Sequence, residues 1–392
     1  MCKDSKEYKN RLMDIVNDGM QEKYGDGFIT DLWDRISDEL LNHIIPDGKV
    51  RLFLMMYDAV NYCKENGIGF QPEFCNEGMM CAFVLDIGLV NPMKPHYRCE
   101  CGYYEPAPEA NDGFDLPLKV CPYCGKIMRG DGHDIDYYDL NPKKEYSISV
   151  NIDYSRKDEI LKFLSDKYPE VTFAKVAFSS DNGYSPIDYQ YAPTDNADDL
   201  IIADGETYVK EDGAFSKYGV LSFRKFESSF VYMVADNDSP MQLRPDEKLN
   251  EEIPDLCLKL GDFNSLLAGT PFFSEFSKYY SMFWLLDHPD LMELKNETPE
   301  DTKPTCIEEL IEMLVSCGLE KSRIESAIAA RRDPGSYAED IEPGDEYIEE
   351  FFQNGSIPEY LFCLYKNCRF MKTKSDSIIM AMHFLAEEKI NQ

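Results

Sequence analysis

The chain has 392 residues, of which 43% are hydrophobic and 13% aromatic, so it can bury a sizeable core and is expected to form two or three domains. It has thirteen cysteines without a secretory disulfide framework, and no apolar run reaches the length of about 18 residues that indicates a membrane span. We therefore expect a soluble cytoplasmic protein without a membrane partner. The net charge of −33, from 73 acidic and 40 basic residues, predicts weak or no nucleic-acid binding, because such binding depends on Lys and Arg neutralising phosphates.

Three helices are predicted near the N-terminus. Residues 5–22 and 29–44 carry apolar side chains at helical spacing. A third helix begins near Pro46 and stops at Gly67, a residue that commonly ends helices. We therefore assign residues 1–90 to an N-terminal helical part that leads into the next region.

Four cysteines in two close pairs follow within residues 91–140. Two short-spaced pairs on separate turns can place four thiolates about 2.3 Å from one zinc ion. This pattern predicts a zinc ribbon with a structural Zn²⁺, since four thiolates leave no open position for water or substrate. The predicted ligands are Cys99, Cys101, Cys121 and Cys124.

Two histidines, His96 and His133, flank the cysteines. Either could be a metal ligand, but a hydrogen-bonded structural histidine is the interpretation we favour. The four thiolates already complete a tetrahedral site.

The region after the cysteines predicts a mixed sheet followed by helices. Residues 145–154 alternate between apolar and polar side chains, which is typical of a half-buried strand. A charged helix at 156–167 is followed by short strand-like runs with acidic loops between them. We assign 141–250 to the sheet and 251–392 to a mostly helical region. The further strand-like runs are 173–178, 199–203, 219–224 and 229–235.

The cysteine block resembles the zinc-bearing insert in the palm of PolC, the replicative family C DNA polymerase of low-GC Gram-positive bacteria. NPMKPHY precedes the first cysteine pair, GFDLP precedes the second and DGHDI follows it, in the family's order. Segments 302–314, 317–333 and 357–390 resemble the family's helical fingers. The resemblance implies an α+β fold: a PolC-like palm with a mixed sheet, an inserted zinc ribbon and a C-terminal helical fingers-like region.

The resemblance also implies a degenerate catalytic site. The family holds two metal ions with aspartates that fall here at Ser147, Ser149 and Met233, and neither a hydroxyl nor a thioether replaces an anionic oxygen ligand of Mg²⁺. We therefore expect no catalytic residues, and Mg²⁺ only if the chain is active. Asp153 could take over such a role only after a register slip, and Asp236 or Asp238 could do so only if their strand shifted by a few residues.

The expected nucleotide contacts are altered as well. The family's phosphate-cradling loop falls at residues 71–77, where Glu73 stands in the place of an arginine. A carboxylate there repels a triphosphate. Lys374 matches a family lysine that resembles a nucleotide or template contact, while Asp376 replaces a histidine.

Three hypotheses remain open from the sequence. The first is a catalytically inactive PolC-like homologue that acts as a binding or regulatory protein, with replication proteins or another protein as partner. The second is a small active family C polymerase whose carboxylates have moved. The third is an acidic decoy that mimics nucleic acid.

Overall fold

The computed structural model describes residues 5–25, 29–75, 78–136, 144–180, 183–203, 205–225, 232–236, 239–244, 306–332, 345–368, 373–379 and 382. The chain divides into two compact units. The first comprises residues 1–134, 144–271 and 383–392, and the second comprises 135–143 and 272–382. Each unit is considered by itself below. None of the described helices is long and apolar enough to cross a membrane.

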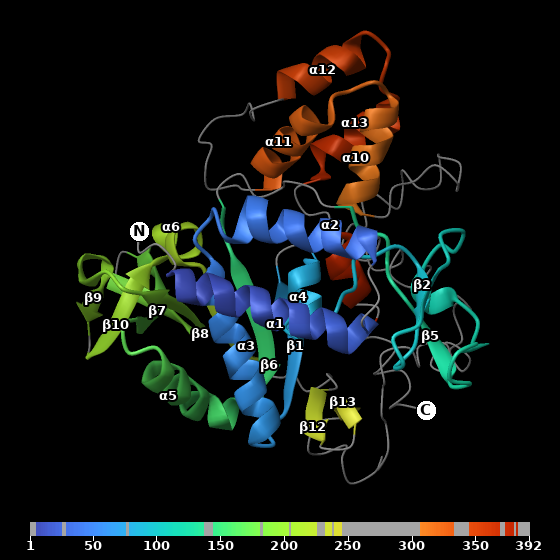
Figure 1. The fold of residues 1–392 in the computed structure, drawn as a ribbon. Coiled ribbons are helices and arrows are strands. Elements are labelled where there is room, and N and C mark those ends of the chain that lie inside the picture. Colours follow the sequence, from blue (N-terminus) through green and yellow to red (C-terminus); the bar gives the residue numbers. More distant parts are fainter. Residues whose placement is uncertain are drawn as a thin grey trace. The chain divides into compact units, whose positions relative to one another are not determined.

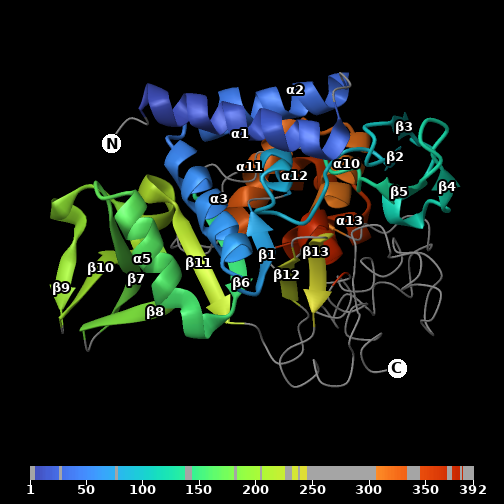
Figure 2. The same ribbon diagram turned by 60° about the horizontal axis from the view of Figure 1, so that its bottom comes forward.

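The first unit packs helices α3 and α5 against one face of a large sheet, and helix α1 packs on α3 and α4 (Figures 1 and 2). Helix α1 begins at the cap Ser5, whose hydroxyl accepts a hydrogen bond from the Tyr8 N–H, and it ends at Gly25 in the left-handed region. The α-helices are α1 (Lys6–Tyr24), α2 (Thr30–Asp38), α3 (Val50–Glu65), α4 (Met80–Val84), α5 (Lys157–Lys167) and α6 (Glu211–Gly213). Short 3-10 or π-helical turns are η1 (Glu39–Ile44), η2 (Gly113–Asp115), η3 (Tyr154–Arg156), η4 (Ala197–Asp199) and η5 (Ala214–Tyr218).

The sheet has nine strands in the order β13-β12-β1-β6-β11-β8-β7-β10-β9. It is mixed, as predicted, because β6–β11 and β7–β10 pair in parallel and the other neighbours are antiparallel. The strands are β1 (Phe70–Cys75), β6 (Ser147–Ile152), β7 (Thr172–Ser180), β8 (Gly183–Thr194), β9 (Ile201–Ala203), β10 (Glu206–Lys210), β11 (Val220–Lys225), β12 (Tyr232–Asp236) and β13 (Ser239–Arg244).

The central strand β6 corrects one expectation. Its apolar residues join the core with α1 and α3, as the alternation predicted. Its polar face is buried too, however, since Ser149 is 5% and Asn151 3% exposed. The strand lies between β1 and β11 and is buried on both faces rather than half-buried.

Two predicted loops are strands. Residues 71–75, taken as part of a phosphate-cradling loop, lie in β1 and pair with β6. The acidic stretch after β7, taken as a loop, contains the twelve-residue strand β8. Both predictions were wrong because hydrogen bonds to neighbouring strands, which come from distant sequence, override weak local strand signals.

The cysteine block forms a second, four-stranded antiparallel sheet in the order β3-β2-β5-β4. We call residues 96–131 the cysteine ribbon. Its small core contains Tyr97, Leu116 and Met128 together with two of the cysteines. The strands are β2 (His96–Arg98), β3 (Tyr104–Pro106), β4 (Lys119–Val120) and β5 (Ile127–Asp131).

The described part of the second unit is helical, in agreement with the sequence. Its core is formed by side chains such as Ile311, Ile328 and Leu361, which are almost fully buried. The helices expected between 251 and 305 lie outside the described residues. The labelled helices are α10 (Ile307–Ser316), α11 (Lys321–Arg332), α12 (Asp345–Gln353) and α13 (Glu359–Lys366), and a shorter helix covers 374–379.

Candidate functional site

The four cysteines lie on two tight turns of the cysteine ribbon. The first turn joins β2 to β3, and its Gly102 N–H donates to the Cys99 carbonyl over 2.9 Å. The second joins β4 to β5, and its Gly125 N–H donates to the Cys121 carbonyl over 3.0 Å. Both glycines have φ in the left-handed region, at 83° and 73°, which glycine adopts without a steric penalty.

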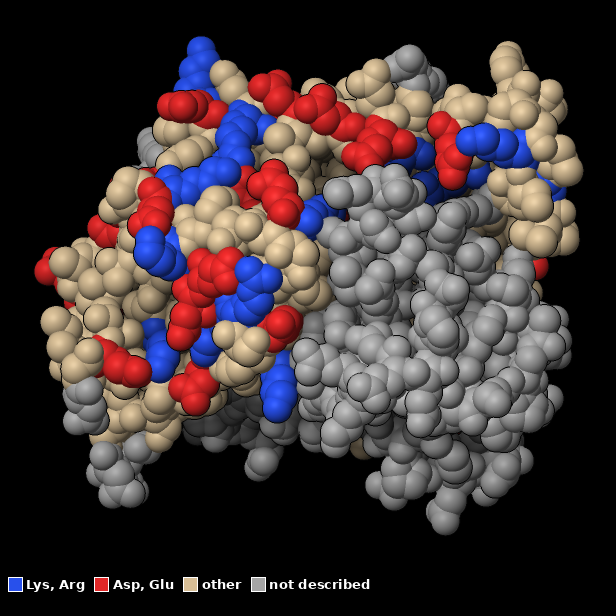
Figure 3. Space-filling view, turned by 90° about the horizontal axis from the view of Figure 1, so that it is seen from below, with Lys and Arg blue, Asp and Glu red and all other residues tan. Residues whose placement is uncertain are grey.

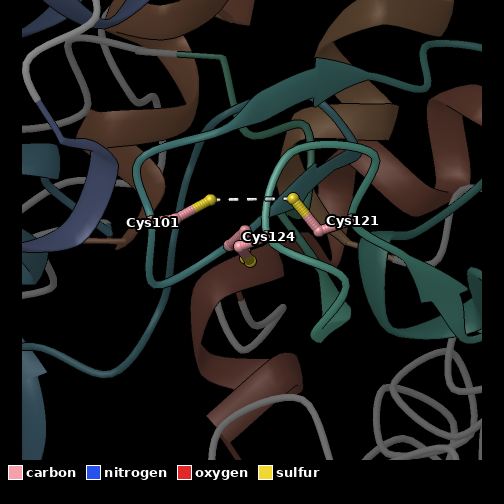
Figure 4. Close-up of side chains that lie close together, drawn as sticks. Cys101, Cys121 and Cys124 are labelled. Atoms are coloured by element: carbon pink, nitrogen blue, oxygen red, sulfur yellow. Dashed lines mark hydrogen bonds between the residues drawn. The ribbon is translucent and has the colours of Figure 1, made fainter.

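The four sulfur atoms converge on one point. All lie within 4.8 Å of one another, with Cys99 Sγ 3.4 Å from Cys124 Sγ and Cys101 Sγ 3.6 Å from Cys121 Sγ. Figure 4 shows the side chains of Cys101, Cys121 and Cys124 directed toward one another. A tetrahedral ion with bonds of about 2.3 Å separates its sulfur ligands by about 3.8 Å. The cluster therefore fits a metal ion of this kind, and it is the one such group among the described residues.

The environment of the thiols differs across the cluster. Burial raises the pKa of Cys99 to about 12. Burial also opposes ionisation of Cys121, but hydrogen bonds from the backbone N–H groups of Cys124 and Tyr123 outweigh it and lower the pKa of this thiol to about 7. Metal ligands must be thiolates. Cys121 loses its proton at a lower pH than Cys99 does, so it forms the thiolate more readily.

The two flanking histidines are not part of the sulfur cluster. His96 Nδ1 lies 2.7 Å from the Lys94 carbonyl oxygen. His133 Nδ1 lies 2.8 Å from Asp112 Oδ2, and both of these side chains are fully buried. Each histidine therefore holds together a loop next to the ribbon, as the interpretation from sequence expected.

A buried ion pair fixes the base of the cysteine ribbon. Asp131 on β5 is 2% exposed, and Arg98 Nε on β2 lies 2.5 Å from its Oδ2. The Arg98 guanidinium also stacks over the Phe83 ring of α4, 5.8 Å from its centroid. Burial alone would raise the pKa of Asp131, but the Arg98 charge outweighs it and lowers that pKa to about 2. No pattern in the sequence indicated this pair.

A second candidate site is the polar face of the central sheet. Ser147, Ser149 and Asn151 alternate along β6 on the face opposite the apolar core. Cross-strand partners share a face, so the register adds Gln71 from β1 and Ser222 from β11. The described side chains of β1, β6 and β11 include no carboxylate.

Much of this polar face is closed to solvent. Gln71 and Ser222 are each 1% exposed. The Nδ2 of Asn151 and the Oγ of Ser222 are buried without a hydrogen-bond partner among the described residues. Amides and hydroxyls of this kind offer weak dipoles and no anionic oxygen to a divalent ion, and the register adds the positive charge of Arg224 opposite Asn151. Gln71 and Ser222 were not singled out from the sequence, because only the sheet register brings Gln71 beside Asn151 and Ser222 beside Ser149.

The remaining positions considered for metal binding are Met233, Asp153 and Asp236. Met233 on β12 is the register partner of Phe70, and Phe70 pairs with Ile152 on the opposite face from Ser149. Asp153 follows β6, and its Oδ1 accepts hydrogen bonds from the N–H and the hydroxyl of Ser155 at 3.1 and 2.7 Å. The side chains of Glu73, Asp236 and Asp238 lie outside the described residues.

Lys374 starts the short helix at 374–379 in the second unit. Its backbone N–H donates to Oε2 of the buried Glu308 over 2.8 Å. Thr373 and Asp376 form a reciprocal capping box, with N–H to side-chain oxygen distances of 3.1 and 3.3 Å. Asp376 therefore has a local structural role. The nucleotide contact expected at Lys374 stays a prediction.

Comparison with known proteins relates one part of the chain to bacterial replicative polymerases. Residues 10–182 match the family described as the bacterial DNA polymerase III alpha NTPase domain. A "DNA polymerase III PolC-type" of Mycoplasma genitalium is 29% identical over 191 residues, which is 45% of this chain and 13% of that protein. Proteins of the same name from Thermotoga petrophila and Bacillus subtilis are 37% identical over 119 residues and 31% identical over 154. Those matches cover 30% and 38% of this chain but only 9% and 10% of the relatives.

Proposed function

The chain is PolC-like over residues 10–182, and from this premise we propose that it is a catalytically inactive homologue that acts as a binding or regulatory protein in DNA replication. In this proposal the nine-stranded sheet is the palm, the cysteine ribbon is the palm's zinc insert and the helical second unit corresponds to the fingers. The PolC-type relatives are roughly ten times longer than the matched segment, so their activity belongs to proteins with many more parts.

The polar face of β6, which has no carboxylate among the described side chains of β1, β6 and β11, is the observation that carries this proposal. Phosphoryl transfer needs metal ions that neutralise charge on the phosphate oxygens, and carboxylates hold those ions. Ser147 and Ser149 occupy the positions where the family alignment places aspartates. Around them the register places the uncharged Gln71, Asn151 and Ser222, and it adds the positive charge of Arg224, which repels a metal ion.

The contacts of Asp153 argue against a displaced active site. Its carboxylate is engaged in the turn after β6, where it accepts two hydrogen bonds from Ser155. Asp153 also lies four residues beyond Ser149, roughly 13 Å along the strand, so it cannot share an ion with that position. An active polymerase with moved carboxylates therefore has less support than the inactive homologue.

The ion in the cysteine ribbon is proposed to be a structural Zn²⁺. Four thiolates with sulfur separations near 3.5 Å suit the tetrahedral preference of zinc and leave no ligand position for water. The ion would hold the two turns together and take no part in chemistry.

Weak nucleic-acid binding is part of the same proposal. The chain carries a net charge of −33. On the described part of the face in Figure 3, Lys and Arg side chains are interspersed with Asp and Glu and do not form a continuous basic stripe. Such a surface neutralises few phosphates, so a protein partner in the replication machinery is the better candidate.

Primer extension tests the absence of activity. The purified chain, free of host polymerase, should give no product with either Mg²⁺ or Mn²⁺. Product that persists and is abolished by Asp153→Asn or Asp236→Asn would replace the proposal with an active enzyme.

Metal titration tests the reason for the inactivity. Wild-type protein should show no Mn²⁺ site by electron paramagnetic resonance, and Ser147→Asp/Ser149→Asp should create one. The matched control is Ser165→Asp/Ser322→Asp, which adds the same two charges at exposed helical positions. Mn²⁺ bound equally by wild type and both variants would show that the sheet face is not the determining feature.

A further inference from the structure

Four large apolar side chains are exposed together on the outer hairpin of the cysteine ribbon. Leu118, Val120 and Ile127 are each 62% exposed, and Tyr123 at the tip of the turn is 84% exposed. We call these four residues the hairpin patch. In Figure 2 strand β4 lies at the outer end of the ribbon.

The strand geometry gathers these side chains on one side. Val120 and Ile127 are cross-strand partners, so they share a face, and Leu118 lies two residues before Val120 on the same side by strand alternation. The intervening Lys119 pairs with Met128, which is fully buried. The hairpin therefore directs one face into the ribbon core and presents the other to solvent.

The ribbon does not need the hairpin patch for its own folding. Its core is formed by Tyr97, Leu116 and Met128 with the buried cysteines, and none of the four patch residues belongs to it. Exposed apolar groups of a few hundred Å² are unfavourable on a protein without a partner and commonly mark an interaction site. The patch thus points to a partner that covers it.

The adjoining strand edge is also open. Strand β4 is terminal in the ribbon sheet and pairs only with β5 among the described strands. Its outer backbone N–H and C=O groups can accept an added strand, while pockets beside alternate side chains give specificity. An extended segment would form hydrogen bonds with these backbone groups of β4 and would cover Leu118 and Val120 at the same time.

The net charge of the chain indicates which kind of partner fits the patch. A second copy is disfavoured, because each chain carries −33 and two such chains repel each other. Long-range attraction favours a basic segment. Next to the patch, Lys119 and Lys126 are paired with Glu105 and Glu100, so they do not require an acidic partner.

We propose that the hairpin patch docks an extended segment of a partner protein, with apolar residues at alternate positions and flanking Lys or Arg, as an added strand beside β4. This inference rests on the proposed binding role and names the surface that performs it. The negative charge of the chain attracts the basic segment, and the apolar contacts then fix its register beside β4.

The test uses a fluorescein-labelled peptide in which Val alternates with Thr between Lys pairs. Fluorescence anisotropy with the full zinc-loaded chain should show saturable binding, and Val120→Ser/Ile127→Ser should weaken it at least about tenfold, or 1.4 kcal/mol. The matched control is Leu41→Ser/Ile202→Ser, which removes two side chains that are 61% and 80% exposed elsewhere and should change affinity less than about twofold.

A single substitution guards against misfolding. Tyr123→Ser removes a ring that is 84% exposed and otherwise contacts Tyr103, and it keeps the backbone N–H that faces Cys121. It should weaken binding several-fold while the zinc content stays unchanged. The proposal would be overturned by failure of the wild type to bind, by equal losses in the patch and control pairs, or by a dimer that the patch pair abolishes. These results are independent of primer extension, which alone decides whether the chain is inactive.

Discussion

The cysteine ribbon and the polar face of the central sheet are the two places where a PolC-like chain is expected to bind metal, and they differ completely. The ribbon has four convergent thiols on two turns. The sheet face has serines, amides and no described carboxylate. Both lie in the first unit, so a single folded body combines a complete metal cluster with a position that lacks the groups for one.

The difference has a physical reason. The ribbon core is small, and bringing four thiolates together is favourable only when an ion neutralises them, so ion and fold depend on each other. Two aspartates at 147 and 149 would instead repel each other on one strand face if no ion were bound. Serines at these positions relieve that repulsion at little cost in packing, because the sheet is held by its apolar face.

The largest expected effect comes from breaking the cysteine ribbon. Cys121→Ser/Cys124→Ser should reduce the metal content from one ion per chain to none and unfold residues 96–131, since structural zinc contributes about 10–16 kcal/mol in small zinc-binding peptides. Elemental analysis and limited proteolysis measure the two consequences. Cys317→Ser/Cys363→Ser, which changes two cysteines of the second unit outside the cluster, should leave both unchanged. Full metal content in the first variant would exclude the cluster as the metal site.

The ion pair at the ribbon's base should give the next largest effect. Asp131→Asn leaves the Arg98 charge without its buried partner and should lower the free energy of unfolding by about 3–5 kcal/mol at pH 7. Urea denaturation measures it. The control Asp166→Asn changes a carboxylate that is 69% exposed and should cost less than about 1 kcal/mol.

The same carboxyl group should make stability depend on pH. Its pKa of about 2 in the folded chain is below the value of about 3.9 for an unfolded aspartate. The carboxylate therefore stabilises the fold above pH 4, and about 2.6 kcal/mol is lost as the pH falls from about 5 to 1. Asp131→Asn should flatten this part of the pH profile, and an unchanged profile would contradict the assignment.

Binding to primer-template DNA should change little with any substitution, because it should be weak from the start. We expect a Kd above about 10⁻⁴ M at physiological salt, beyond the usual nonspecific range, and Lys374→Ala should not alter it. Anisotropy with labelled DNA at two salt concentrations measures this. Tight binding with a steep salt dependence would mean that the fold gathers basic side chains into a groove.

The smallest effect is expected at the polar face itself. Ser147→Ala/Ser149→Ala should change the free energy of unfolding by less than about 1 kcal/mol, since neither hydroxyl is expected to bind an ion. Ile148→Ala, between them on the apolar face and fully buried, should cost about 2–5 kcal/mol. A large loss from the serine pair would indicate that these hydroxyls have a structural or binding role.

The sequence predicted the elements whose signal is local. The apolar spacing of α1 and α3, the helix stop at Gly67 and the alternation of β6 each involve residues within one or two turns of each other. The cysteine cluster belongs to the same class, because each pair of ligands sits on a single turn whose glycine lies within four residues. Short-range spacing alone was enough to predict four converging sulfur atoms.

Strand pairing, burial and ion pairs between residues far apart in the sequence were decided by the tertiary structure alone. Strand β1 was read as a loop, since Gln71 and Pro72 carry little strand propensity and pair with β6 only through the fold. The burial of Ser149 and Asn151 and the Arg98–Asp131 pair follow from neighbours far along the chain. Sequence patterns report which residues a backbone can bring to one turn or face, whereas sheet register and burial depend on long-range pairing energies that no local window contains.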